Sequence, residues 1–156
     1  MKFVNIQFLI LRLALAVFFL HEGIGKISDG WLLDSAPLVK QLKSFDEDAV
    51  GYHKQYLERV AIPHANIWSR AIPLGEAAVG LSMLLGLLVR LSAFCGILMI
   101  LNLHAANGFL WSFQFFFISS AIMLFSILLV VLIAGAGRWM GIDAVIAKKR
   151  PRGFLW

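Results

Sequence analysis

The feature that most constrains this chain is a series of long apolar runs separated by brief polar breaks. Hydrophobic residues make up 60% of the 156 positions and charged residues 15%, whereas a soluble domain has about 45–50% and about 25%. Such an excess needs lipid as a second solvent, where a helix satisfies its own backbone. We therefore expect an all-α, polytopic membrane protein, a four-helix transmembrane bundle with spans at residues 3–24, 72–89, 91–106 and 113–133.

The longest polar stretch, residues 25–71, is expected to form an outer loop of a single membrane domain that covers residues 1–156. Helical spacing in two parts of this loop predicts short interfacial helices that lie on the membrane surface, at residues 34–42 and 46–60. The second helix would present one apolar face, made of Tyr52, Tyr56, Leu57 and Val60.

Local signals predict where the spans begin and end. Pro73 is placed in the first turn of the second span, where proline is tolerated. Arg90 is placed in the tight turn before the third span, and Asn107-Gly108 marks the turn after it. Glycine ends the fourth span, and a basic, amphipathic tail follows over residues 134–156.

The basic residues predict the orientation. The net charge is +5, and its carriers flank the apolar runs, as Lys2 and Arg90 do, or gather in the C-terminal tail. These three regions share one side of a four-span bundle, and the positive-inside rule makes that side cytoplasmic, with both termini. The same placement favours membrane lipids as partners and argues against nucleic acid.

Polar side chains from three spans are expected at one level near the outer surface. Ionisable groups inside spans are costly and normally face the bundle interior. The expected group comprises His21, Glu22, Lys26, Glu76, Asn102, His104 and Asn107.

Two interpretations of this group stay open. In the functional one it binds a quinone head group, with Glu76 or His21 passing protons and Lys26 or His104 donating to a carbonyl oxygen. In the structural one, Glu76 pairs with Lys26 and the asparagines join helices.

Metal and haem chemistry are disfavoured. His21 and His104 are expected at equal depth on different spans, which ligation of a haem requires, but a hydrogen-bonding pair meets the same condition and is favoured. The sequence contains no HExxH or CxxC spacing, so no dedicated metal site is expected. The single cysteine, Cys95, excludes an intramolecular disulfide and reads as an apolar core residue.

Arg12 lies deep in the first span, and no acid in any span shares its level. It can snorkel to lipid phosphate, bond to freed carbonyls, or bind an anionic ligand, and it joins Glu76 and His21 as a catalytic candidate. The aromatic cluster at residues 113–117 is interpreted as lipid-facing or interfacial, or as a seat for a pigment or quinone tail.

The order of several short motifs resembles the DoxX family. In the first span these are Leu11-Arg12-Leu13-Ala14, Phe18-Phe19, Gly23 and Lys26. In the second they are Gly75-Glu76, Gly80, Leu81, Gly86 and Arg90. The ending Gly135-Ala136-Gly137-Arg138, with Asp143 soon after, is similar to the closing segment of that family.

The resemblance implies a four-span subunit of a redox system in a bacterial-type inner membrane. The related DoxD proteins are the membrane subunit of thiosulfate:quinone oxidoreductase, and other members are linked to oxidative-stress assemblies with a sulfurtransferase and superoxide dismutase. If the chain takes part in catalysis, it would be an oxidoreductase subunit that acts with quinone and partner proteins. The long outer loop departs from the family pattern and suggests a docking surface.

By position, the resemblance marks Arg12, Gly23, Lys26, Glu76, Gly80 and Arg90. Two other functions remain open beside quinone-linked electron transfer. One is a non-catalytic accessory or scaffold subunit of a larger respiratory or photosynthetic complex. The other is a small transporter or lipid-binding protein that uses the outer pocket.

Overall fold

The computed structural model describes residues 2–111, 119–138 and 141–149, and these residues form helices and turns without a strand. The α-helices are α1 (Lys2–Ser28), α2 (Ala36–Asp46), α3 (Gly51–Tyr56), α4 (Ala65–Leu85), α5 (Val89–Ala106), α6 (Ser119–Ala134) and α7 (Ile142–Lys149). A π-helical turn, η1 (Leu57–Ala61), continues α3, and a 3₁₀ turn, η3 (Ala136–Arg138), follows α6. The predicted all-α class is therefore confirmed for the described residues.

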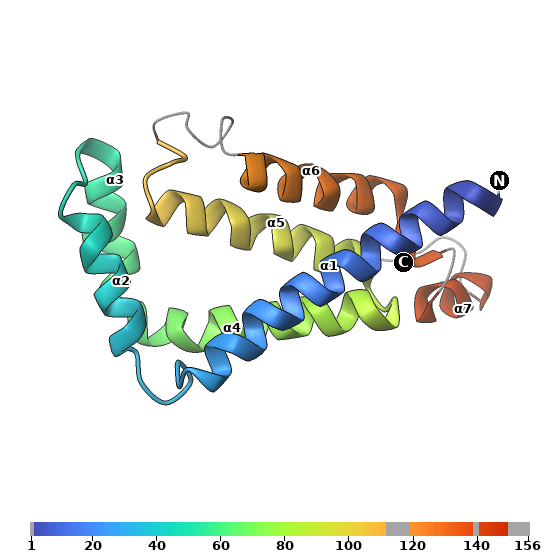
Figure 1. The fold of residues 1–156 in the computed structure, drawn as a ribbon, viewed down its shortest axis with the longest axis horizontal. Helices are drawn as coiled ribbons and strands as arrows, with labels where there is room; N and C mark the ends of the chain where they lie inside the picture. The colour runs from blue at the N-terminus through green and yellow to red at the C-terminus, as the bar shows by residue number, and fades with distance from the viewer. Residues whose placement is uncertain (1, 112–118, 139–140, 150–156) are drawn as a thin grey trace.

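Figure 1 shows α1, α4, α5 and α6 running lengthwise, with α2 and α3 standing across one end and α7 at the other. We call these the α2–α3 end and the α7 end. Helix α1 packs along α4, and α5 packs against both α4 and α6. The start of α1 and the whole of α7 lie at the same end.

Glycines bring α1 and α4 together along their length. A Cβ atom on Gly23 would lie 2.6 Å from the backbone nitrogen of Ala77, and one on Gly80 would lie 2.7 Å from that of Leu20. Because neither backbone can retreat, these positions need glycine, which is how small residues let membrane helices pack closely. The small residues of the second span, Gly80 among them, predict such a close approach of helices, and the structure confirms it at Gly80.

Buried apolar side chains form two separate clusters. The larger cluster fills the lengthwise bundle and includes Leu15, Phe19, Met83, Val89, Ala93, Leu128 and Val131. The smaller cluster lies at the α2–α3 end and includes Leu38, Leu42, Ala49, Leu57, Ala61, Ala65 and Ala106. The loop helices therefore pack onto the bundle through a core of their own.

Two expected boundaries need correction. Helix α4 begins at Ala65, so Pro73 lies inside it and not in its first turn. Hydropathy marks only the apolar part of this helix, and the helix extends beyond it. Arg90 lies in the first turn of α5, because the reversal is made by Gly86 at φ 67° and Leu88 at φ 52°. The expected glycine endings are confirmed at Gly108 and Gly135, which have φ values of 84° and 60°.

The predicted apolar face of the second loop helix is half wrong. Leu57 is buried and Tyr56 is half-buried, but Tyr52 and Val60 are 76% and 39% exposed. The π turn accounts for Val60, because its extra residue per turn rotates the residues after Leu57 away from their expected face, whereas Tyr52 precedes the turn.

Length and composition make two described helices candidate membrane spans, the stretch Ile6–Ser28 of α1 and the whole of α5. Helix α6 contains a shorter apolar helix, Ser120–Ala134. The expected start of the fourth span at residue 113, and the aromatic cluster at 113–117, lie outside the described residues. The basic positions Arg150 and Arg152 also lie outside them.

Candidate functional site

Three of the expected site residues form an ion cluster between α1 and α4. The Lys26 ammonium lies 2.9 Å and 2.8 Å from the two carboxylate oxygens of Glu76 and 2.9 Å from Glu22. The side chains of Lys26 and Glu76 are 20% and 14% exposed, and that of Glu22 is 42% exposed. This is the Glu76–Lys26 pair of the structural interpretation, and its three formal charges sum to −1.

The other four expected residues do not join this cluster. His21 lies on the exposed surface of α1. The Nδ1 atom of His104 lies 2.9 Å from the carbonyl oxygen of Ile100, one turn back in its own helix. Asn107 accepts the Phe109 backbone N–H at 3.2 Å and so shapes the turn after α5. A haem held between His21 and His104 therefore has no support from this arrangement.

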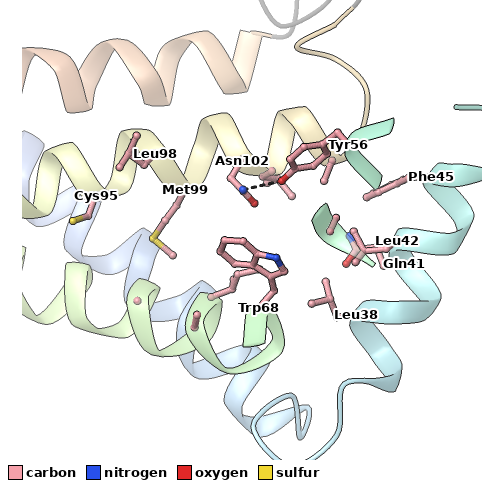
Figure 2. A pocket seen from close by; sticks show the side chains of 16 residues that line it. Leu38, Gln41, Leu42, Phe45, Tyr56, Trp68, Cys95, Leu98, Met99 and Asn102 are labelled. Carbon is pink, nitrogen blue, oxygen red and sulfur yellow. Dashed lines mark hydrogen bonds between the residues drawn. The ribbon is translucent and has the colours of Figure 1, made fainter. Parts of the chain in front are cut away.

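Asn102 instead belongs to a separate cavity of 420 Å³ at the α2–α3 end. Helices α2, α4 and α5 form its walls, and Tyr56 of α3 lies at one side (Figure 2). The side-chain amide of Asn102 donates to the Tyr56 hydroxyl at 2.9 Å. Leu98 and Leu103 of α5, which are 50% and 51% exposed, give the cavity an apolar rim.

The Asn102–Tyr56 pair offers a further hydrogen-bond donor in either orientation of the amide. With the amide nitrogen toward the phenol, the phenol keeps its own proton, and that proton has no acceptor among the described residues. With the amide reversed, the nitrogen would be the remaining donor. Burial raises the pKa of Tyr56, against the opposing effect of the hydrogen bond from Asn102, so the phenol stays protonated at neutral pH.

Trp68 supplies a second donor to this cavity. Figure 2 shows its indole ring projecting from α4 into the space between Met99 and Leu42. Its Nε1 atom is buried and has no hydrogen-bond partner within the described part of the chain. A buried N–H without an acceptor costs about 1–3 kcal/mol, so a ligand that brought an acceptor oxygen would remove that cost.

The chemistry of the cavity wall therefore favours an uncharged, largely apolar ligand with acceptor oxygens. A volume of 420 Å³ falls in the range of small-molecule sites, about 300–1,000 Å³. No charged side chain lines the cavity in the described part of the chain, and Glu76 turns to Lys26 although its neighbour Gly75 borders the cavity. Sequence reasoning missed both donors, because Tyr56 was interpreted only as part of an apolar face and Trp68 carried no motif that singled it out.

Arg12 lies at the opposite end of the bundle, and the expectation that it snorkels to lipid is wrong. The residue is 4% exposed and is within electrostatic reach of Asp143, which is fully buried at the start of α7. No acid within the spans shares its level, as expected, but the tail folds back and supplies one. One sequence signal could have indicated this contact, namely that Asp143 is a lone acid, two residues after Gly141, in an otherwise basic tail.

Asp143 also holds the turn between α4 and α5. One carboxylate oxygen accepts the Leu88 N–H at 2.8 Å and the other accepts the Val89 N–H at 3.0 Å. Its own N–H donates to the carbonyl oxygen of Gly86 at 2.8 Å. An acid that accepts the first N–H groups of a helix also stabilises the positive end of the helix dipole.

His53, which its place in the polar stretch 25–71 predicts to be solvated, instead contacts the end of α5. It is half-buried, and its Nε2 lies 2.9 Å from the carbonyl oxygen of Ala106 at the end of α5. Gly108 makes room for the ring, because a Cβ atom there would lie 2.9 Å from it. No group of three or more metal-ligating side chains occurs among the residues that the structure describes.

Comparison with known proteins gives one match. A family model described as DoxX matches residues 7–108, more than half of the chain. No curated protein and no solved structure matches.

Proposed function

The chain belongs to the DoxX family, and we propose that it binds a quinone in the membrane as a subunit of an electron-transfer complex. The family and the apolar helices together indicate a membrane protein. The observation that carries the proposal is the cavity between α2, α4 and α5. Its apolar rim faces away from the bundle, so a ligand dissolved in lipid can reach it.

A quinone fits this cavity chemically. Its ring and tail are apolar, and its carbonyl oxygens accept hydrogen bonds without donating any. The Asn102–Tyr56 pair and the Trp68 Nε1 atom would hold the carbonyls, and Met99 and Leu42 would contact the ring. A bound quinone would supply the capacity to accept electrons and protons, with the electrons arriving from a partner protein.

The proposed topology has four spans, formed by α1, α4, α5 and the segment that ends with α6. The α7 end carries Arg12, Arg90 and Lys148, and by the positive-inside rule we assign it to the cytoplasmic side of a bacterial-type inner membrane. The cavity and the ion cluster then face the outer side. Reporter fusions at residue 33 and at the C-terminus would test this orientation, and cytoplasmic signals from both sites would contradict it.

The binding test compares two equal substitutions on one helix. Ala71 borders the cavity, whereas Ala78 lies two turns further along α4, is also exposed, and does not border the cavity. In lipid nanodiscs, a short-tailed quinone should bind Ala71→Phe about tenfold more weakly than the unmodified protein, a change of about 1.4 kcal/mol. Ala78→Phe should bind as the unmodified protein does, by titration calorimetry.

A second variant tests the polar contact. Tyr56→Phe removes the hydroxyl group and keeps the ring. It should weaken quinone binding about fivefold, in line with the loss of one hydrogen bond of about 1 kcal/mol. Equal affinities for all these variants would contradict the site. A second result would also contradict it, namely that extraction of the purified protein releases bound phospholipid and no quinone. That result would favour the lipid-binding function.

A second candidate function, an accessory subunit of a larger membrane complex, is favoured by the surface of the α2–α3 end. Three apolar or aromatic side chains are largely exposed there, with charged residues between them in the sequence. They are Leu33, Val50 and Tyr52, at 92%, 79% and 76%. Purification in mild detergent followed by native mass measurement separates the two functions. An accessory subunit would copurify with other polypeptides, and the Ala71→Phe variant would leave that assembly intact.

A further inference from the structure

A second hollow, of 650 Å³, lies at the α2–α3 end beside the quinone cavity. It is formed where three segments meet, namely the last turn of α2, the connection into α3, and the turn that follows α5. Phe45 borders both hollows. The two differ in chemistry, because the wall of the second contains a carboxylate, that of Asp48.

The electrostatics of this second hollow favour a cation. Two helices, α2 and α5, end at its wall, and the C-terminal end of each carries a partial negative charge of about half an electron. The Asp48 carboxylate adds a full negative charge, and the described residues of the wall include no lysine or arginine. The short helix α3 begins here with its positive end, and Asp48 outweighs that partial charge.

The last carbonyl groups of α5 lie beside two ring nitrogens. The Ala105 carbonyl oxygen accepts the Trp111 Nε1–H at 2.9 Å, and the Ala106 carbonyl oxygen lies 2.9 Å from Nε2 of His53. Among the described residues of the wall there is no lysine or arginine that would neutralise the charge at this helix end.

Aromatic rings line the same hollow. Tyr52, Phe109 and Trp111 all border it, and Tyr52 and Trp111 are 76% and 44% exposed. Trp111 is held by its bond to Ala105 and by a ring contact with Tyr56, with centroids 6.3 Å apart. The faces of such rings attract ammonium groups through their quadrupole.

We propose that this hollow binds an ammonium group, carried either by the head group of a phospholipid or by a small soluble amine. Aromatic faces, a carboxylate and two helix C-termini are the features that recognise such a cation. An anion would meet the same negative charges and be repelled. This inference does not depend on quinone binding in the neighbouring cavity.

The test uses the purified full chain in detergent and four soluble probes. These are ethanolamine, tetramethylammonium, a dihexanoyl phosphatidylethanolamine below its micelle concentration, and the matching phosphatidylglycerol, each titrated at constant ionic strength. We expect saturable binding of at least one ammonium-bearing probe and none of phosphatidylglycerol. Equal binding of free ethanolamine and the lipid identifies a soluble amine as sufficient, whereas binding of the lipid alone identifies the head group of a phospholipid.

Matched variants assign the binding to the hollow. Asp48→Asn should weaken it about tenfold, the effect of one nearby charge. Glu47→Gln removes the same charge from the neighbouring exposed residue, which does not border the hollow, and should change affinity less than about twofold. Tyr52→Leu should weaken binding about fivefold, because it keeps apolar area and loses the ring.

Three results would overturn the inference. They are the absence of saturable binding by any ammonium probe, equal effects of Asp48→Asn and Glu47→Gln, and binding of phosphatidylglycerol as tight as that of phosphatidylethanolamine. Asp48 and Tyr52 are exposed, so both variants are expected to fold. Far-UV circular dichroism and the unfolding midpoint check this directly.

Discussion

At the α7 end three segments of the chain meet in close contact, whereas at the α2–α3 end the helices leave two hollows. A Cβ atom on Gly86 would lie 2.8 Å from the Cα atom of Gly141 and 2.7 Å from the Arg12 guanidinium. The hollows at the other end measure 420 Å³ and 650 Å³. The closed end contains the deeply buried charges, and the open end contains the groups that can reach a ligand.

This difference separates stability from binding. At the α7 end each polar group of Asp143 meets a partner within the chain, so the end is held together without a ligand. At the α2–α3 end the Trp68 donor is buried without a partner in the described residues, and the Asn102–Tyr56 pair has a donor to spare. Substitutions at the two ends should therefore differ in what they change.

The largest effect is expected from Asp143→Ala. It leaves the Leu88 and Val89 N–H groups without their acceptors and removes the charge opposite the buried Arg12. Breaking a buried charged network in this way costs about 3–5 kcal/mol. Unfolding in sodium dodecyl sulfate, followed by circular dichroism, measures the loss, and Asp143→Asn should lose less because its amide oxygen still accepts one N–H. An Asp143→Ala protein as stable as the unmodified chain would contradict the role given to this end.

Two glycine substitutions compare the ends directly. Gly86→Ala forces a side chain into a turn at φ 67° and against Arg12 and Gly141, so it should destabilise the protein by about 2 kcal/mol. Gly75→Ala meets only the flexible end of Met99, at 3.2 Å, and should change stability by less than about 0.5 kcal/mol. Thermal unfolding of both variants in the same detergent makes the comparison, and equal losses would show that the two ends are packed alike.

The sequence predicted the helices well because hydropathy and glycine signals are local. The ends of α5 and α6 follow from Asn107-Gly108 and from the glycines after residue 134, and both are confirmed. The start of α4 was missed because its first turns carry polar residues such as Arg70. The exposure of Val60 was missed because the sequence carries no mark of the π turn at residues 57–61.

The candidate site was harder to predict, because the depth of a residue along a helix does not determine which way its side chain points around the helix axis. Glu22, Lys26 and Glu76 share a level and also face one another, so they meet. Asn102 lies at the same end of the bundle but faces Tyr56. Tyr56 belongs to the loop between the first two spans, and the periodicity of the sequence does not predict where this loop packs. The partner of Arg12 was missed for a related reason, since a contact between residues 12 and 143 depends on how the tail folds back.

The smallest expected effect concerns Glu76. It tests whether the ion cluster serves the packing of α1 against α4 or the binding of a ligand in the cavity. Glu76→Gln keeps a hydrogen-bond acceptor near Lys26, which retains Glu22, so the loss of stability should be about 1 kcal/mol. Glu58→Gln is the control, because Glu58 pairs with Lys54 at 3.9 Å where both side chains are about half exposed, and it should have no measurable effect. Quinone affinity should be unchanged by Glu76→Gln, since Glu76 does not border the cavity. A variant that kept its stability and lost quinone affinity would show that Glu76 acts on the ligand, and the ion cluster would then belong with the cavity and not with the packing of α1 against α4.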